Sequence, residues 1–474
     1  MPEAFDAVFV GSSFASSFFL ARWLELAPPT ARALVIEAGP RRPHAWRLAH
    51  RKEVLGWRED HGLYTNETPD KPWITHVELG GNSNCWWACT PRLAPEDFAL
   101  RTRYGQGADW PITYEELEPF YVRAETMMGV AGADDHPVCP RTAPFPLPPH
   151  RLSAPDEALA RAFPRLFTPQ PCARPSVATS KRARCCASGV CELCPIDSKF
   201  TVQNELAHLF EDPRVTLWTE ARCEGIDVQN DVARGVRVRR GGREETVRAE
   251  LVALGANAIF NPWILLRSGL EHPELGVGLH EQVGVDVIVD LHGMDAFGGS
   301  TSITGHLYAL YLGERRRDRA GALIEVWNVP MLRLEAGKYR QRVKLKAVIE
   351  DTRGGSRVDV DPNDPSRPRV RHAGPSEWTR RAIARLEDDL QPVLDALPVE
   401  RVRIGEPLPT EAHAIGSTPM GNDPATSVID RNLVHHRVRN LVVLGSGAFP
   451  CATPANPTLT LAALSLRAAE AMLA

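Results

Sequence analysis

The segment VGSSFASSFF, residues 10–19, limits how the chain can begin to fold, because it lies between an apolar run and a helical one. The run before it, Phe5–Val10, is apolar and rich in β-forming residues, as in a strand buried within a parallel sheet. From Ser12 to about Leu26 the apolar residues recur at helical spacing, and Ala33–Gly39 follows as a second buried strand that carries Glu37. This order places a pyrophosphate at a helix N-terminus and a ribose hydroxyl on a carboxylate, so it predicts a dinucleotide-binding turn.

Serines replace the second and third glycines of the usual G-x-G-x-x-G pattern. Gly11 supplies the tight turn, whereas Ser13 stands where the backbone approaches the pyrophosphate and Ser16 where the helix packs on the strand. The Ser13 side chain must therefore rotate away or donate its hydroxyl to a phosphate oxygen. A strand–helix–strand unit that binds no nucleotide also fits this segment, so the turn alone does not decide between the two.

Length and composition exclude several classes of function. A chain of 474 residues, 43% of them hydrophobic, can bury a large core and is expected to form two domains. The 55 Lys and Arg nearly balance the 59 Asp and Glu, which predicts no binding to nucleic acid. No stretch approaches the roughly 18 apolar residues of a membrane span, and the N-terminus shows no signal peptide. We expect a cytoplasmic protein, exported only together with a signal-bearing partner subunit.

Four further stretches carry a family resemblance over nearly the whole chain. They are LGGNSNCWWACTPRLAPEDF from Leu79, DWPITYEELEPFYVRAE from Asp109, LVALGANAIFNPWILLRSG from Leu251, and the segment from His413 to Leu473, which begins HAIGSTPMG. Together with the N-terminal turn they resemble, in order, the glucose–methanol–choline (GMC) oxidoreductases, which are FAD-dependent flavoproteins. The similarity is greatest to the branch that contains pyranose oxidase and gluconate-type dehydrogenases. The resemblance implies that the N-terminal turn is an FAD site.

The resemblance also implies a fold class, α/β and α+β overall. A Rossmann-like FAD-binding domain, discontinuous in sequence, would comprise residues 1–95, 200–284 and 411–474. A second, substrate-binding domain, comprising residues 96–199 and 285–410, would contain a mainly antiparallel sheet with covering helices. Apolar spacing predicts one of these helices over 376–396, and Pro457 is suited to start a final helix, Thr458–Leu473.

The cofactor contacts implied by the resemblance are Gly11, Ser12, Ser13, Phe14, Ala15, Glu37, Gly81, Asn82, Asn84, Cys85, Trp86, Cys223, Gly255, Gly445, Ser446, Pro457 and Thr458. Two of the implied positions depart from the family pattern. Cys85 stands where some relatives join a histidine covalently to the flavin; a cysteinyl–flavin bond is chemically open, but we expect a non-covalent flavin beside a small apolar side chain. The last glycine segment reads GSG rather than DGS, so one carboxylate near the flavin is absent.

The expected chemistry is oxidation of an alcohol, including a sugar or glycoside hydroxyl. A flavin accepts a hydride, so the protein must also remove the hydroxyl proton. Because the pKa of an alcohol lies about 9 units above that of histidine, free proton transfer would cost roughly 13 kcal/mol, and the two losses should be coupled. By resemblance, His413 is the base and Asn456 orients the substrate oxygen. The electrons would pass to a redox protein, a quinone or oxygen. A non-redox lyase with structural FAD, or a non-catalytic escort protein, are the alternatives.

Four cysteines, Cys185, Cys186, Cys191 and Cys194, lie within ten residues. Thiolates at this density suit zinc or an iron–sulfur cluster. The pattern resembles the cluster-binding insert of iron–sulfur glucose dehydrogenases in the same family, although its last spacing is one residue shorter. Many relatives instead carry a cysteine-rich turn followed by proline and a lysine, comparable to Lys199, with no known metal. An iron–sulfur cluster, which would relay electrons from the flavin, a zinc site and a metal-free turn therefore stay open.

Overall fold

The N-terminal strand forms the middle of a seven-stranded sheet in the computed structural model, which describes residues 4–55 and 62–473. Strand β1 (Ala4–Val10) is parallel to β2 (Ala33–Ile36) on one side and to β8 (Arg243–Leu254) on the other. The strand order is β5-β2-β1-β8-β7-β6, and β17 also pairs with β8. The remaining bounds are Val215–Trp218 for β5, Ala221–Gln229 for β6, Val232–Arg240 for β7 and Leu441–Val443 for β17. The buried run of β1 explains its central place.

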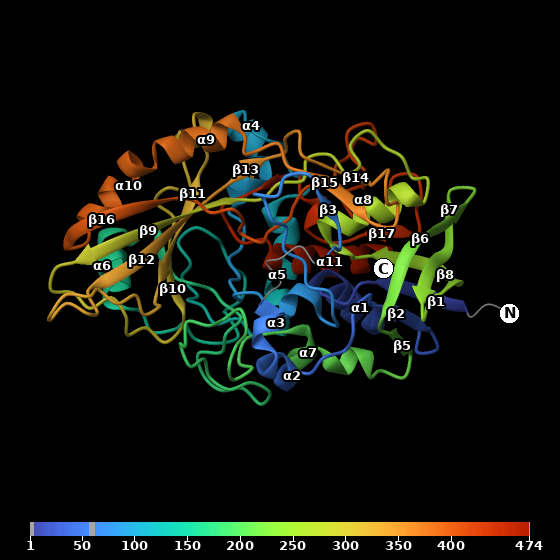
Figure 1. The fold of residues 1–474 in the computed structure, drawn as a ribbon, viewed down its shortest axis with the longest axis horizontal. Coiled ribbons are helices and arrows are strands. Elements are labelled where there is room, and N and C mark those ends of the chain that lie inside the picture. The colour runs from blue at the N-terminus through green and yellow to red at the C-terminus, as the bar shows by residue number, and fades with distance from the viewer. Residues whose placement is uncertain (1–3, 56–61, 474) are drawn as a thin grey trace.

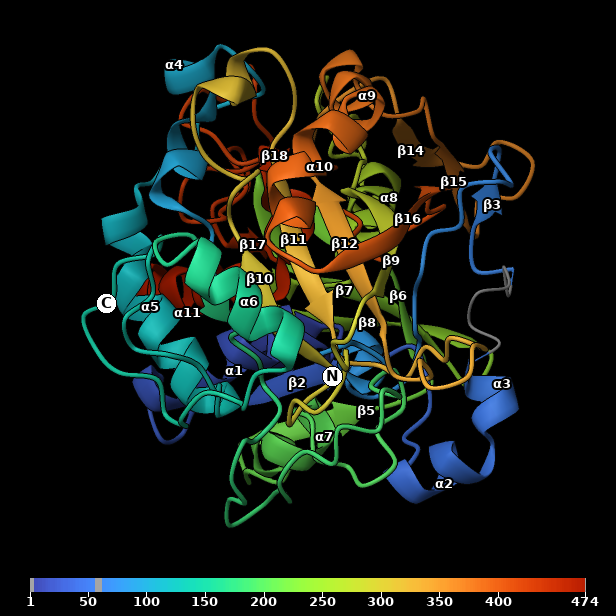
Figure 2. The same ribbon diagram turned by 90° about the vertical axis from the view of Figure 1, so that its left-hand side faces the viewer.

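A second sheet of six strands is antiparallel throughout, in the order β16-β9-β12-β11-β10-β4. Its strands are β4 (Phe167–Pro169), β9 (Val283–Leu291), β10 (Ile303–Leu307), β11 (Ala322–Trp327), β12 (Arg342–Ile349) and β16 (Val399–Pro407). Figure 1 shows this sheet on the left and the seven-stranded sheet on the right. Helices α6 (Ala154–Ala162), α9 (Glu377–Ala384) and α10 (Leu386–Asp395) pack on the six-stranded sheet, as the turned view in Figure 2 also shows. The single helix predicted over 376–396 is therefore wrong, because Arg385 leaves the helical conformation and separates α9 from α10.

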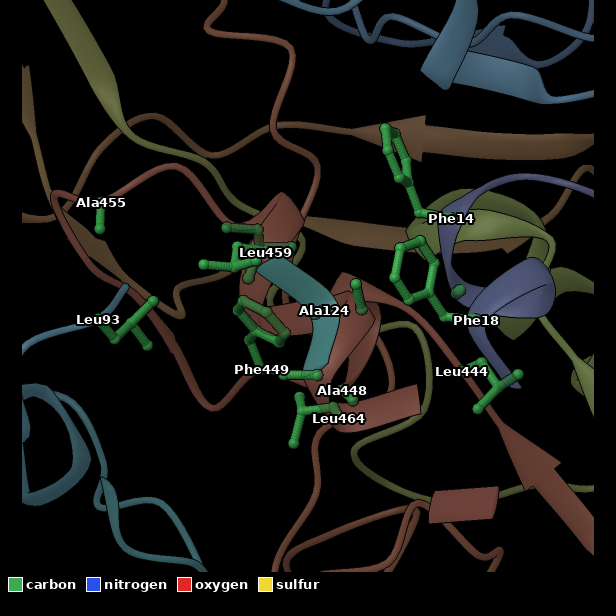
Figure 3. Close-up of a cluster of buried hydrophobic side chains, with 14 of the residues drawn as sticks. Phe14, Phe18, Leu93, Ala124, Leu444, Ala448, Phe449, Ala455, Leu459 and Leu464 are labelled. Carbon is green, nitrogen blue, oxygen red and sulfur yellow. The ribbon is translucent and has the colours of Figure 1, made fainter. Parts of the chain in front are cut away.

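The last helix, α11 (Thr458–Leu473), has the predicted bounds. It packs against α1 (Phe14–Leu26) and α5 (Tyr114–Met128). Figure 3 shows part of this core, with Phe14 and Phe18 from α1, Ala124 from α5, and Leu459 from α11. Because these side chains are buried, the loop that leads into α11 is held in place by the core of the protein.

The shorter elements connect and cover the two sheets. They are α2 (His44–Ala49), α3 (Arg51–Leu55), α4 (Leu100–Tyr104), α7 (Val202–Glu205), α8 (Asn257–Arg267), the paired β13 (Asp351–Thr352) and β18 (Cys451–Ala452), and the small sheet of β14 (Arg357–Val360), β15 (Pro368–Arg371) and β3 (Thr65–Asn66). Across residues 4–55 and 62–473, no helix is long and apolar enough to cross a membrane. The predicted fold class, an α/β architecture with a second antiparallel sheet, is confirmed, whereas the division into two domains stays a prediction.

Candidate functional site

A cavity of about 820 Å³ is lined by residues of both sheets. Its volume lies within the range of known ligand and cofactor sites. The predicted cofactor and catalytic residues in its wall are Gly11, Ser12, Ser13, Phe14, Ala15, Glu37, Gly81, Asn82, Cys85, Trp86, Cys223, Gly255, His413, Gly445, Ser446, Asn456, Pro457 and Thr458. Segments from the start, middle and end of the sequence therefore meet at one site.

The turn after β1 has the geometry that a phosphate needs. Gly11 has a φ of +90°, and a Cβ there would lie 2.5 Å from the carbonyl oxygen of Gly255, so only glycine fits. Ser13 is the N-cap of α1, but its side chain makes no capping hydrogen bond. The first N–H groups of α1 are thus left without a side-chain acceptor, which is the arrangement that binds phosphate at a helix N-terminus.

The two serines of the turn are accommodated by glycines opposite them. A Cβ on Gly81 would lie 2.9 Å from the Cβ of Ser13, and a Cβ on Gly255 would lie 2.2 Å from the hydroxyl of Ser16. The Ser16 hydroxyl donates to the carbonyl oxygen of Val10 at 3.1 Å. In the usual motif the glycines stand on the turn and the helix, whereas here they stand on the segments that face them. Gly81 and Gly255 thus leave room for the serine side chains.

Glu37 follows β2 and is buried beside the turn. One carboxylate oxygen accepts from the Ser12 hydroxyl at 2.5 Å and the other from the N–H of Gly39 at 2.9 Å. Burial raises the pKa of Glu37 to about 7, against the hydrogen bonds from Ser12 and Gly39, which lower it. Each carboxylate oxygen keeps a further lone pair, so Glu37 can still accept from a ligand hydroxyl at the cavity wall.

Three features of this site match the groups of FAD. The glycine turn, the uncapped N-terminus of α1 and the carboxylate after β2 are the groups that hold the pyrophosphate and ribose of a dinucleotide. The cavity continues from them toward His413 and Asn456, which leaves space for a ring system beyond the phosphates. The residues therefore fit FAD.

His413 and Asn456 lie 43 positions apart in the sequence and line the same cavity. The N–H of His413 donates to Glu281 at 2.9 Å, and its ring Nδ1 lies 3.2 Å from Oε1 of Gln282. The side-chain oxygen of Asn456 is buried and has no hydrogen-bond partner among the described residues. Because an unpaired buried acceptor is costly, this oxygen is a natural contact for a ligand donor.

The imidazole of His413 is held neutral. Burial lowers its pKa to about 3, and the ammonium groups of Lys346 and Lys71 add to the effect. A neutral ring at ordinary pH has a lone pair that can accept a proton.

The six-stranded sheet contributes a charged face to the other end of the cavity. In the strand register, Lys346 of β12 lies opposite Glu325 of β11 and opposite Asp286 of β9. Lys344 lies opposite Trp327 of β11. The ammonium of Lys344 lies 3.4 Å from the centre of the Trp327 ring. We call Asp286, Glu325, Trp327, Lys344 and Lys346 the charged wall; all five line the cavity.

Sequence reasoning missed the charged wall. The alternation in RVKLKAVI of β12 indicates a strand with one buried face and one polar face, but a polar face that borders a cavity has the same pattern as one that borders solvent. Trp87 was missed as well, although it follows the predicted Trp86; its ring lies 4.8 Å from that of Trp327.

Asn84 is not among the residues that line the cavity, so its prediction as a cofactor contact gains no support from the site. Its side-chain amide donates to Glu78 at 2.7 Å and to the carbonyl of Leu79 at 2.9 Å, and it therefore stabilises the loop before Cys85. Cys85 itself lines the cavity, and burial raises the pKa of its thiol to about 11.

The four clustered cysteines do not converge. In the described part of the chain, no group of three or more His, Cys, Asp or Glu side chains is placed to hold a metal ion. Cys186 is exposed, whereas the thiols of Cys191 and Cys194 contact the Ser302 hydroxyl and the N–H of Ser198. The nearby Lys199 is buried and donates to three backbone carbonyls, which ties this turn to the loop around Cys85. The predicted metal site is thus not supported, because each buried thiol has a separate environment.

Comparisons with known proteins agree with this site. Residues 340–465 match the family model "GMC oxidoreductase". The chain is 24% identical to the fructose dehydrogenase large subunit of Gluconobacter japonicus, over 99% of this chain and 97% of the relative. It is 30% identical to a C-glycoside 3-oxidase of Arthrobacter globiformis, over 55% of this chain and 53% of the relative. Among solved structures, pyridoxine 4-oxidase from Mesorbium loti has a TM-score of 0.68 and 19% identity, with 98% of each chain covered.

The fold, the cavity and these relatives define an FAD-dependent oxidoreductase that oxidises a CH–OH group. The order of the motifs predicts a GMC oxidoreductase, and this resemblance is borne out by the match of residues 340–465 to that family's model and by the whole-chain likeness to the fructose dehydrogenase large subunit. A lyase or an escort protein is not favoured, since the relatives above are named as dehydrogenases or oxidases.

Proposed function

We propose that this enzyme oxidises a hydroxyl of a neutral, polyhydroxylated substrate of the saccharide class, with His413 as the base and Asn456 as the orienting group. The observation that carries this proposal is the placement of both residues in one cavity with the charged wall. FAD, when bound, supplies the hydride acceptor. The free ring nitrogen of His413 receives the hydroxyl proton as the carbon loses its hydride, and the side-chain N–H of Asn456 donates to the reacting oxygen and orients it.

The charge balance of the wall favours an uncharged substrate. The carboxylate of Glu411, which also lines the cavity, pairs with Lys346 at 2.7 Å, and Asp286 lies 3.5 Å from Lys344. Burial raises the pKa of Glu325 and lowers that of Lys344, which shifts both groups toward their neutral forms. Carboxylate and ammonium charges thus largely offset each other along the wall, so neither an anionic nor a cationic substrate gains a strong net attraction.

The unpaired acceptor atoms beside the charged wall favour a substrate that carries hydroxyl donors. One oxygen of Asp286 and one of Glu411 are buried without a hydrogen-bond partner among the described residues. Acceptor oxygens call for ligand donors, and a substrate with several hydroxyls supplies them. The paired rings of Trp87 and Trp327 offer an apolar surface beside these acceptors. The whole-chain likeness to a protein named fructose dehydrogenase supports the same class.

We also propose that the flavin is held without a covalent bond and that its electrons leave to an external acceptor other than oxygen. The raised pKa of Cys85 keeps it as a thiol, and a thiol is a weaker nucleophile than a thiolate. The dehydrogenase assignment rests on likeness to a dehydrogenase large subunit. Residues 1–95, 200–284 and 411–474 would form the FAD-binding domain, with 96–199 and 285–410 covering it.

The test is anaerobic mixing of the FAD-loaded enzyme with D-fructose, D-glucose, D-gluconate and D-glucosamine, followed by visible absorption. We expect loss of the oxidised flavin bands with a neutral sugar at a lower concentration than with D-gluconate or D-glucosamine. Trp327→Leu should raise the sugar concentration for half-maximal rate, whereas Tyr339→Leu, on an exposed loop, should not. Faster reduction by D-gluconate than by any neutral sugar would contradict the substrate class, and an oxidised flavin with all four would contradict the saccharide proposal.

A further inference from the structure

Gln282 is a buried amide that no part of the expected chemistry uses, and it lies just before strand β9. Its Nε2 donates to the carbonyl of Thr453 at 2.8 Å and to that of Ala455 at 3.0 Å. Both partners are backbone carbonyls, which only accept hydrogen bonds, so the nitrogen of the amide must face them. The side-chain oxygen of Gln282 is therefore the atom that faces Nδ1 of His413, 3.2 Å away.

This orientation decides which ring nitrogen of His413 carries the proton. The Gln282 oxygen can only accept, so Nδ1 of the neutral imidazole must donate to it. Nε2 then has the lone pair, and no described residue forms a hydrogen bond with Nε2. We propose that Gln282 is a positioning residue that fixes the Nδ1–H tautomer of His413 and so presents Nε2 to the cavity as the proton acceptor.

The same amide also links the two halves of the catalytic pair. Through its nitrogen it binds the carbonyl of Ala455, the residue directly before Asn456, and through its oxygen it binds His413. Its neighbours strengthen the link: Glu281 accepts from the N–H of His413, and the ring of His280 accepts from the N–H of Ala452. Residues 280–282 thus hold the His413 and Asn456 segments at a fixed separation. The role of Gln282 in catalysis rests on the proposed function, whereas the Nδ1–H tautomer of His413 does not depend on it.

The charged groups that face His413 do not offer another explanation for its tautomer. Lys71 and Lys346 lower the pKa of the ring, and Lys71 is ion-paired with Glu281. Neither ammonium can accept a proton from Nδ1, and Glu281 contacts the backbone N–H rather than the ring. Among the described residues, Gln282 is the acceptor within hydrogen-bond distance of Nδ1.

The direct test is long-range ¹H–¹⁵N correlation NMR on the FAD-loaded enzyme with ¹⁵N-labelled histidine, without substrate. His413 is assigned by the signal that disappears in His413→Asn. We expect the protonated nitrogen to be Nδ1 at pH 8. Gln282→Leu should give a mixture of tautomers or the Nε2–H form, and Gln282→Glu should raise the pKa of His413, because a carboxylate stabilises the imidazolium. Gln391→Glu, a matched charge change on an exposed part of α10, should leave the His413 signals unchanged.

An Nε2–H tautomer in the unaltered enzyme, or an unchanged tautomer in folded Gln282→Leu, would overturn the proposal. If Gln282→Leu does not fold, the pKa of His413 in Gln282→Glu tests the proposal instead. An unchanged or lower pKa in that variant would also overturn it. With a reducing sugar in hand, Gln282→Leu should lower the rate of flavin reduction at saturation more than it raises the half-saturating concentration. Failure of every sugar to reduce the flavin would refute the proposed function while leaving the tautomer assignment intact.

Discussion

Adding one methyl group at Gly255 should disturb the turn after β1 that we propose as the FAD site. The alanine Cβ would lie 2.2 Å from the Ser16 hydroxyl and 3.4 Å from its Cβ, so the hydroxyl alone causes the clash. If Ser16 rotates away, it loses its bond to Val10, and if it does not, α1 must move from β8. By either route, Gly255→Ala should lower the free energy of unfolding by about 1–3 kcal/mol.

Removing the clashing oxygen should restore part of this lost stability. Ser16→Ala alone costs about 0.5–1.5 kcal/mol for its hydrogen bond, partly offset by the helix propensity of alanine. In the double variant the nearest contact is the ordinary one between two Cβ atoms, so the two substitutions should be coupled by roughly 1–2 kcal/mol.

Calorimetric unfolding of the FAD-loaded enzyme measures this cycle. With an unfolding entropy of about 2.1 cal/mol/K per residue, 474 residues give a shift of about 1 °C in Tm per kcal/mol. We expect Gly255→Ala to lower the Tm by about 1–3 °C and the double variant to recover part of it. Gly354→Ala adds a Cβ where no atom lies within 4 Å and serves as the control. An unchanged Tm in Gly255→Ala, or no recovery with Ser16→Ala, would refute the packing argument.

Three further predictions concern the cofactor and the base. Glu37→Ala should weaken FAD binding by about 1–3 kcal/mol, the cost of a lost charged hydrogen bond, as measured by equilibrium dialysis; unchanged affinity would rule out this contact. Acid denaturation should release the flavin from the protein, because the Cys85 thiol need not bond to it; flavin retained on the pellet would show a covalent link. The pKa of His413, about 3 when folded and near 6.5 when unfolded, means that the unfolded chain binds the proton first as the pH falls. The free energy of unfolding therefore falls below about pH 6.5 and is about 2 kcal/mol lower at pH 5 than at pH 8. The measurement is the Tm as a function of pH. His413→Asn should show a smaller fall in Tm, because it lacks this titrating group.

The sequence predicts the elements whose pattern is local. The strand, turn and helix of residues 4–26 and the bounds of α11 follow from apolar spacing and from Pro457. The convergence of Glu37, His413 and Asn456 on one cavity follows from the order of the motifs and not from the residues alone.

What the sequence does not predict depends on contacts between distant segments. The lysines of β12 face a cavity because residues of the seven-stranded sheet and of the loop around Glu411 line its other walls, which a strand pattern cannot reveal. Asn84 is predicted as a cofactor contact because its neighbours in the sequence line the cavity, yet its side-chain amide donates to Glu78 instead. Cysteine density indicates a metal only if the thiols converge, and the turn that contains Cys191 and Cys194 directs them to different partners.

In the proposed reaction, His413 takes the hydroxyl proton as the hydride leaves the substrate. The most direct measurement is stopped-flow reduction of the bound flavin under anaerobic conditions, with whichever of D-fructose and D-glucose reduces the unaltered enzyme faster. Loss of a general base typically costs 10²–10⁴-fold in rate, so we expect His413→Ala to slow reduction by about that factor while FAD stays bound. Reduction at an unchanged rate in His413→Ala would contradict the account and place the base elsewhere.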